Sequence, residues 1–131
     1  MKVLALDFGA ARTGVAVSDP TGVVARPLGV VERAAGEAGL AEVARIAREQ
    51  EVDEVVVGHP LTLRGERGEQ ARAAERFAQA LRATVDVPVV LFDERFTTDL
   101  AQQTSSATPE DARAAAHLLS SYLEWAGSSR R

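Results

Sequence analysis

The hydrophobic pattern of this chain changes its period once, and this change restricts the possible folds more than any other feature. Three short apolar runs, separated by turn residues, fill positions 3–31, whereas helical patterns alternate with short apolar runs from residue 39 onward. Closely spaced strands predict an antiparallel meander, and strands alternating with helices predict parallel crossovers. We therefore expect an α/β fold with a mixed five-stranded sheet flanked by helices. Strands 1–3 should be antiparallel, and strands 4 and 5 should run parallel to strand 1.

The expected elements follow the order strand, strand, strand, helix, strand, helix, strand, helix, helix. Apolar runs predict strands at residues 3–6, 13–18, 23–31, 55–58 and 87–92. Apolar residues at helical spacing predict helices at about residues 39–50, 71–81, 98–103 and 109–125. Pro27 should place the third strand at a sheet edge, because proline cannot donate a hydrogen bond to a neighbouring strand. We expect one domain over residues 1–126 and a flexible tail over 127–131.

The composition excludes several kinds of site. The chain has 131 residues, no cysteine and a formal net charge of −4. Without cysteine there can be no disulfide, no thiolate zinc site and no cysteine nucleophile. The apolar N-terminal run is too short for a signal peptide, and no run is long enough to cross a membrane. We therefore expect a cytoplasmic protein without a membrane partner.

Positive charge is carried almost entirely by arginine, and part of it is clustered. Lys2 is the single lysine, and one segment contains Arg64, Arg67, Arg72, Arg76 and Arg82. Arginine recognises phosphate through its planar guanidinium group, so this segment is a candidate nucleic-acid contact. Alternatively, these arginines belong to solvated helix faces, and the acidic net charge argues against a general nucleic-acid coat.

Three of the predicted strands end in polar residues. The first strand ends in Asp7, the fourth ends in Gly58-His59-Pro60, and the fifth ends in Asp93-Glu94-Arg95. Sites in open α/β sheets gather at the carboxyl ends of the parallel strands. If the first, fourth and fifth strands are neighbours, Asp7 and Glu94 should converge on one crevice.

Asp111 is the third candidate carboxylate. It shares a helical register with Ala115, Leu118 and Tyr122, and this apolar stripe should face the sheet. Three carboxylates with no lysine nearby would repel one another unless a cation lay between them. Hard oxygen ligands suit Mg²⁺ or Mn²⁺, and such a site suits metal-assisted hydrolysis of a phosphodiester.

Each carboxylate also has a purely structural explanation. Asp7 could cap a turn, and Thr108-Pro109-Glu110-Asp111 matches a helix capping box with proline at the first helical position. Asp93 or Glu94 could serve only to hold Arg95 in an ion pair. The functional interpretation therefore depends on the three carboxylates together.

Four stretches of the sequence resemble one known family. They are residues 7–19 (DFGAARTGVAVSD), 56–61 (VVGHPL), 92–98 (FDERFTT) and 111–123 (DARAAAHLLSSYL). In this order, and over nearly the whole chain, they are similar to the YqgF (RuvX) family of RNase H-like proteins. Members of that family are described as Holliday junction resolvases or pre-16S rRNA nucleases.

The resemblance implies an RNase H-like fold and a metal-dependent nuclease. It implies that Asp7, Glu94 and Asp111 are the catalytic residues and the ligands of Mg²⁺ or Mn²⁺. The implied reaction is hydrolysis of phosphodiester bonds in structured RNA or branched DNA. The implied process is 16S rRNA 5′-end maturation or Holliday junction resolution, in the cytoplasm.

Two departures from the family pattern bear on nucleic-acid binding. Residues 99–108 form a shorter segment than is usual before the final aspartate, and they contain no basic residue. His59 replaces the usual leucine beside the crevice, where it could contact a phosphate or be an ordinary packed or surface histidine. The contact missing from the short segment could be supplied elsewhere. The candidate nucleic-acid contacts are Arg12, His59, Arg64, Arg67, Arg72 and Arg95.

Two other functions fit part of the sequence. A binding or scaffold module would use the same surface but lack useful activity because of the short segment. A relative of sugar kinases, actin and Hsp70 would use the Asp-x-Gly turn to hold nucleotide phosphates. That relative needs a second domain and a second glycine-rich loop, for which 131 residues leave no room. A homodimer with a shared basic groove is a further hypothesis.

Overall fold

The computed structural model describes residues 1–97 and 110–129 of the chain. The strands are β1 (Val3–Asp7), β2 (Arg12–Ser18), β3 (Ala25–Glu32), β4 (Glu54–His59) and β5 (Val89–Asp93). The helices are α1 (Glu37–Glu49), α2 (Glu69–Arg82), the short 3₁₀ helix η1 (Glu94–Phe96) and α3 (Glu110–Ser129). The predicted helix at residues 98–103 lies outside the described residues.

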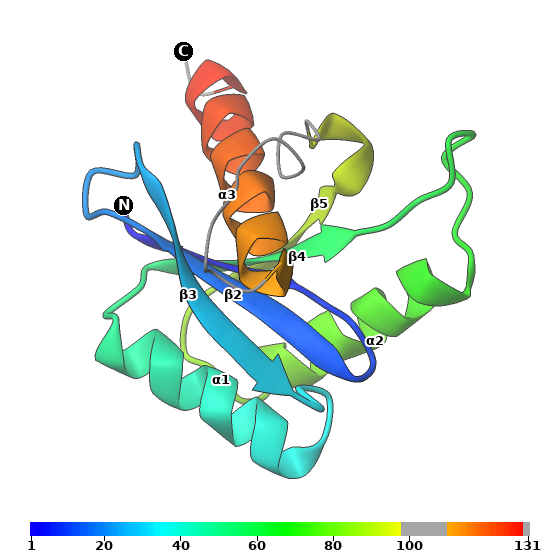
Figure 1. The fold of residues 1–131 in the computed structure, drawn as a ribbon, viewed down its shortest axis with the longest axis horizontal. Helices are drawn as coiled ribbons and strands as arrows, with labels where there is room; N and C mark the ends of the chain where they lie inside the picture. The colour runs from blue at the N-terminus through cyan, green and yellow to red at the C-terminus, as the bar shows by residue number, and fades with distance from the viewer. Residues whose placement is uncertain (98–109, 130–131) are drawn as a thin grey trace.

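The five strands form one sheet in the order β3-β2-β1-β4-β5 (Figure 1). β1 pairs antiparallel with β2 and parallel with β4, β2 pairs antiparallel with β3, and β4 pairs parallel with β5. The predicted mixed sheet is therefore confirmed. Because β1, β4 and β5 are adjacent and parallel, their carboxyl ends lie side by side at one edge of the sheet.

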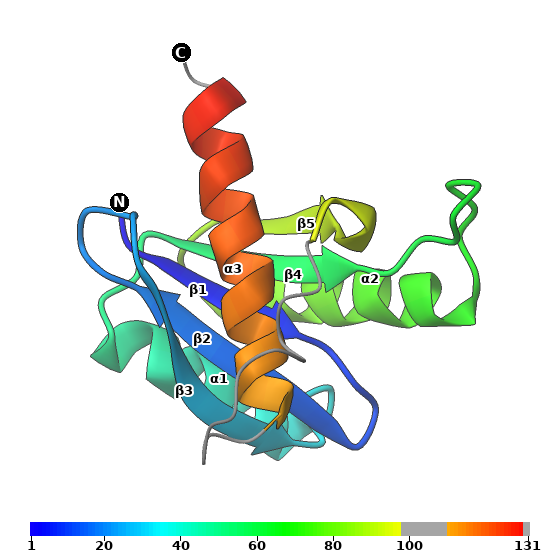
Figure 2. The same cartoon turned by 45° about the horizontal axis from the view of Figure 1, so that its top comes forward.

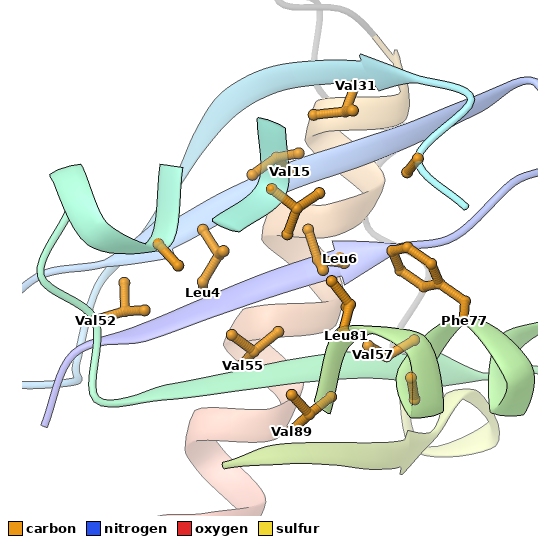
Figure 3. Packing of buried hydrophobic residues seen from close by; sticks show 14 of the residues in the cluster. Leu4, Leu6, Val15, Val31, Val52, Val55, Val57, Phe77, Leu81 and Val89 are labelled. Carbon is orange, nitrogen blue, oxygen red and sulfur yellow. The ribbon is translucent and has the colours of Figure 1, made fainter. Parts of the chain in front are cut away.

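Helices cover both faces of the sheet, and the alternation of side chains along β1 explains how. Leu4 and Leu6 point into the core shared with α1 and α2, where they pack in one cluster with Phe77 (Figure 3). Ala5 points to the opposite face and joins the cluster that contains Leu118 of α3. Figure 2 shows α3 crossing the sheet on the side away from α1 and α2. The central strand is thus apolar on both faces.

The edge strand β3 begins two residues later than the sequence pattern predicts. The side chain of Asp19 accepts hydrogen bonds from the backbone N–H groups of Val23 and Val24, at 2.8 and 2.9 Å. These bonds hold both residues in the turn, so pairing with β2 starts only at Ala25. Pro27 lies on this edge strand, as predicted.

The last helix is longer than the apolar pattern predicts. It continues to Ser129, whereas the pattern fades near residue 125. Gly127 therefore lies within the helix, although the division of the chain into a domain and a tail stays a prediction. Within residues 1–97 and 110–129, no helix has both the length and the apolar character needed to cross a bilayer.

Candidate active site

Asp7 and Glu94 meet at the carboxyl ends of the parallel strands, as the sequence predicts. Asp7 is the last residue of β1, and Glu94 is the first residue of η1, directly after β5. A hydrogen bond joins the two side chains. Because β4 lies between β1 and β5, Glu94 has to reach across the end of β4 to contact Asp7.

Gly58 provides the space for this contact. It is buried near the end of β4, and a Cβ atom at this position would lie 2.5 Å from Oε1 of Glu94. Carbon and oxygen atoms that are not bonded do not approach so closely, so a side chain here would displace the Glu94 carboxyl group. The glycine therefore leaves room for the carboxyl group of Glu94, the residue that directly follows the neighbouring strand β5.

Burial is the largest cause that raises the pKa values of both carboxyl groups. Burial raises the pKa of Asp7, the hydrogen bond with Glu94 opposes this shift, and the nearby charge of Asp111 adds to it. Burial, followed by the charge of Asp7, raises the pKa of Glu94 from 4.5 to about 8. Glu94 therefore holds a proton at neutral pH in the metal-free protein and donates the hydrogen bond to Asp7.

Asp111 lies nearby, in the first turn of α3, but it has a different partner. Its Oδ2 atom forms an ion pair with Nε of Arg12 at 3.3 Å, and 41% of its side chain is exposed. The start of α3 can approach β2 this closely because Gly14 has no side chain to collide with the backbone carbonyl of Asp111. Asp111 is thus held by Arg12, close enough to Asp7 for its charge to act on that carboxyl group.

Two of the three predicted ligands are therefore in contact, and the third is paired with an arginine. Within residues 1–97 and 110–129, no three acidic or histidine side chains are grouped as a ready-made metal cluster. The carboxyl of Asp111 would have to turn from Arg12 toward Asp7 to complete a three-ligand site.

Two of the predicted nucleic-acid contacts share an acidic partner on α2. Nε2 of His59 and Nε of Arg67 lie 2.7 and 2.8 Å from Oε2 of Glu75. The bonds from Arg67 and then His59 lower the pKa of Glu75 to about 2, so the carboxylate is ionised at neutral pH. These contacts connect both ends of the segment between β4 and α2 to Glu75. The segment itself projects away from the sheet (Figure 1).

The other predicted contacts divide into paired and exposed arginines. Nη2 of Arg95 lies 2.6 Å from Oδ2 of Asp93, so Asp93 serves to hold this arginine while Glu94 turns toward Asp7. Arg64 and Arg72 are exposed to solvent. Arg12 is two-thirds exposed although it pairs with Asp111.

An open cavity of about 540 Å³ adjoins the Asp7–Glu94 pair. Phe8 and residues of α2, among them Gln70 and Arg76, also line it. The sequence placed Arg76 in an arginine-rich segment but gave no sign that it shares a cavity with the carboxylates. The roles of Gly58 and Glu75 were also missed, because each depends on contacts between different elements of the fold.

The family comparison decides what kind of protein carries this arrangement. The model of the RuvX family, described as Holliday junction resolvase, matches residues 1–125. The chain belongs to the RuvX family. This result confirms the resemblance inferred from the four sequence stretches, and it places the chain in a family of nucleases.

Curated relatives support the RuvX membership over most of the chain, and each is named "Putative pre-16S rRNA nuclease". A relative from Chloroflexus aurantiacus is 46% identical over 101 residues, covering 77% of this chain and 66% of the relative, which is just under two thirds of its length. A relative from an Anaeromyxobacter species is 44% identical over 133 residues, covering 95% of this chain and 97% of the relative.

Solved structures confirm the RNase H-like fold of this RuvX-family chain. RuvC of Thermus thermophilus, in complex with a Holliday junction substrate, superimposes with a TM-score of 0.69 at 17% identity, covering 98% of this chain and 96% of RuvC. The Holliday junction resolvase of fowlpox virus gives a TM-score of 0.56 at 13% identity, covering 95% of this chain and 99% of the viral protein. At these identities the likeness concerns the fold.

Proposed function

We propose that this RuvX-family protein is a divalent-metal-dependent nuclease that hydrolyses phosphodiester bonds in RNA or branched DNA. The proposed process is 16S rRNA 5′-end maturation or Holliday junction resolution, in the cytoplasm. The observation that most supports this proposal is the contact between Asp7 and Glu94 at the strand ends. The names of the family and of the curated relatives support the same class of reaction.

The donor atoms suit a hard divalent cation. Asp7 and Glu94 offer carboxylate oxygens in a partly buried site, and their raised pKa values reflect first the cost of burying a negative charge there. A cation with a preference for oxygen ligands would remove that cost, so Mg²⁺ or Mn²⁺ is the proposed cofactor. When bound, the ion would supply Lewis-acid chemistry for phosphodiester hydrolysis.

The three carboxylates have distinct proposed parts in holding the ion. Glu94 must lose its proton before it can act as a ligand, so metal binding should release a proton to solvent. Asp111 is the proposed third ligand and must leave Arg12 to join the other two. An exposed ion pair contributes only about 0–1 kcal/mol, so breaking the pair between Arg12 and Asp111 requires little free energy. The freed guanidinium of Arg12 would then face a phosphate.

The proposed nucleic-acid surface extends from Arg12 to the segment between β4 and α2. Arg64 and Arg72 are exposed and can reach phosphates directly. His59, Arg67 and Arg95 are already paired with carboxylates, and a phosphate would have to compete with those carboxylates for them. We therefore expect these three residues to contribute less to nucleic-acid binding. A homodimer that joins two such surfaces is part of the proposal, and light scattering of the full chain tests it.

A nucleic-acid or ribosome-associated binding module is the second candidate function. The observation that favours it is the ion pair between Arg12 and Asp111, which leaves the described carboxylates without a ready-made cluster of three. In such a module, binding would depend on salt concentration, because phosphate contacts release counterions, but no metal-dependent turnover would follow.

The test compares cleavage of a pre-16S rRNA 5′-end fragment and a four-way DNA junction under identical conditions. We expect the wild-type protein to cleave at least one substrate with Mg²⁺ or Mn²⁺ and to stop when EDTA is added. The Asp7→Asn variant, checked for folding by circular dichroism, should be inactive. Binding of both substrates without turnover would favour the second candidate. Equal cleavage by Asp7→Asn would identify a contaminant and remove the basis for the proposed site.

A further inference from the structure

The cavity beside the carboxylates has features that phosphodiester hydrolysis alone does not require. Asp7 and Glu94 line it on the sheet side, and Gln70, Ala73 and Arg76 line it from α2. Its volume of about 540 Å³ falls in the range of pockets that hold a small organic ligand, roughly 300–1,000 Å³. A metal ion at the carboxylates would fill only a small part of this space.

Arg76 is the cationic side chain among the lining residues. Its Nη2 atom lies 3.2 Å from Oε1 of Glu69, but the two side chains are 67% and 79% exposed. A pair this exposed is strongly screened by water, so it holds the guanidinium only weakly. By contrast, Arg67 and Arg95 form shorter pairs with less exposed carboxylates. Arg76 can therefore bind an anion that enters the cavity.

The rest of the cavity combines apolar surface with one neutral polar group. Phe8 is half-buried and is held by stacking on Phe77, with ring centroids 4.5 Å apart and planes inclined by 20°. Pro60 and Ala73 add further apolar surface, and Gln70 offers a hydrogen-bond donor and acceptor. Apart from the three acidic side chains of Asp7, Glu69 and Glu94, the lining is an apolar wall with one neutral polar group and one cation, which suits a sugar and base that carry a phosphate.

We infer that this cavity is a subsite for one nucleotide next to the bond that is cut. The inferred nucleotide places its sugar and base against Phe8 and Ala73, and its phosphate contacts Arg76. This inference rests on the proposed nuclease function, because it assumes that a nucleic-acid strand passes Asp7 and Glu94. It adds to that proposal a residue that positions the strand, and it places the flanking nucleotide on the α2 side of the sheet.

Arg76 and Glu69 line the cavity with opposite charges, so their removal should change nucleic-acid affinity in opposite directions. The probes are a fluorescein-labelled 12-nucleotide single-stranded RNA and a DNA of the same sequence, bound in the presence of Ca²⁺ and followed by fluorescence anisotropy. We expect Arg76→Ala to weaken binding about tenfold and to lower the salt slope by about one unit. We expect Glu69→Gln, which removes a carboxylate facing the phosphate, to tighten binding about two- to threefold.

Arg48→Ala is the matched control, because Arg48 is an exposed helical arginine in the last turn of α1, remote from the cavity. It should bind both probes within twofold of the wild type. A loss in Arg76→Ala that is equal for RNA and DNA assigns the contact to the phosphate, and a larger loss for RNA assigns part of it to the ribose. Unchanged affinity and salt slope in Arg76→Ala would overturn the inference.

A second measurement does not depend on any variant. Adenosine monophosphate is titrated into ¹⁵N-labelled wild-type protein with Ca²⁺ present. The amide signals of Phe8, Gln70 and Ala73 should shift, while that of Arg48 should not. Shifts absent from the cavity residues would overturn the subsite. If the cavity residues respond but no substrate is cleaved with any divalent ion, the cavity is a nucleotide-binding site and the proposed nuclease function fails.

Discussion

Gly58 on β4 lies directly against the carboxyl group of Glu94, and a Cβ atom at Gly58 would come within 2.5 Å of Oε1. β4, which carries Gly58, lies between β1, which ends in Asp7, and β5, which directly precedes Glu94. The missing side chain is therefore what permits the two carboxyl groups to meet. The absence of a side chain at this position of β4 thus determines whether the carboxyl groups at the ends of β1 and β5 can be in contact.

Replacing Gly58 by alanine should separate the geometry of the site from the stability of the fold. We expect Gly58→Ala to lower the cleavage rate about 10- to 100-fold, because a displacement of about 1 Å at a reacting group has effects of this size. The free energy of unfolding should change by no more than about 1 kcal/mol, since the group that must move is the end of a flexible side chain. Single-turnover kinetics and urea unfolding provide the two measurements.

Gly29→Ala is the control for the previous variant. Gly29 lies on the edge strand β3, where a Cβ atom would have no neighbour within 4 Å. Both the rate and the stability of Gly29→Ala should remain close to those of the wild type. A Gly58→Ala protein with the wild-type rate would show that Glu94 does not need this position for catalysis.

The metal-free protein should become less stable as the pH rises. The pKa of Glu94 is about 8 in the folded protein and near 4.5 when the chain is unfolded, so the folded state binds the extra proton between these values. Stability from this group is fully present below pH 4.5 and is lost as the pH rises through 8. The Glu94→Gln variant lacks this titration. The free energy of unfolding of Glu94→Gln minus that of wild type should therefore rise by about 1–3 kcal/mol from pH 5 to pH 9, because only the wild type loses stability from this group.

Urea unfolding with EDTA at several pH values measures this difference. Saturating Mg²⁺ or Mn²⁺ should reduce it, because a bound cation stabilises the ionised pair in the wild type only. A constant difference between the two proteins across this pH range would contradict the pKa assigned to Glu94.

Arg12 should compete with the metal ion for Asp111. The Arg12→Gln variant removes a cation that pairs with Asp111 at 3.3 Å, so Asp111 becomes free to turn toward Asp7. We expect the Mg²⁺ concentration for half-maximal cleavage to fall about two- to fivefold, which corresponds to about 0.4–1 kcal/mol and lies within the range for an exposed pair. Measurement at saturating substrate separates this effect from weaker nucleic-acid binding. A higher Mg²⁺ requirement would mean that Arg12 orients Asp111 for the ion.

The sequence predicts the strand order and the meeting of Asp7 with Glu94 because both follow from local patterns. Each carboxylate comes at the end of an apolar run, and parallel strands bring such ends to one edge. The register of the last helix likewise predicts that Asp111 begins the stripe that packs on the sheet.

The partners of these residues could not be predicted, because they depend on distances between elements. His59 meets Glu75 only because α2 folds back beside β4, and no local pattern joins two residues 16 positions apart. The apolar pattern correctly predicts Gly58 as the end of a strand, but it gives no sign that the missing side chain makes room for Glu94. The pairing of Arg12 with Asp111 similarly requires the close approach of α3 to β2.

The central claim is that Asp7 and Glu94 act together as one metal-dependent catalytic unit, and a double-mutant cycle of single-turnover cleavage rates tests it most directly. The set comprises wild type, Asp7→Asn, Glu94→Gln and the double variant, with Asp86→Asn as an exposed carboxylate control at the other end of the sheet. We predict a loss of at least about 100-fold in each single variant, no further loss in the double variant, and the wild-type rate in Asp86→Asn. Losses that multiply in the double variant, or a single variant that keeps the wild-type rate, would contradict the claim.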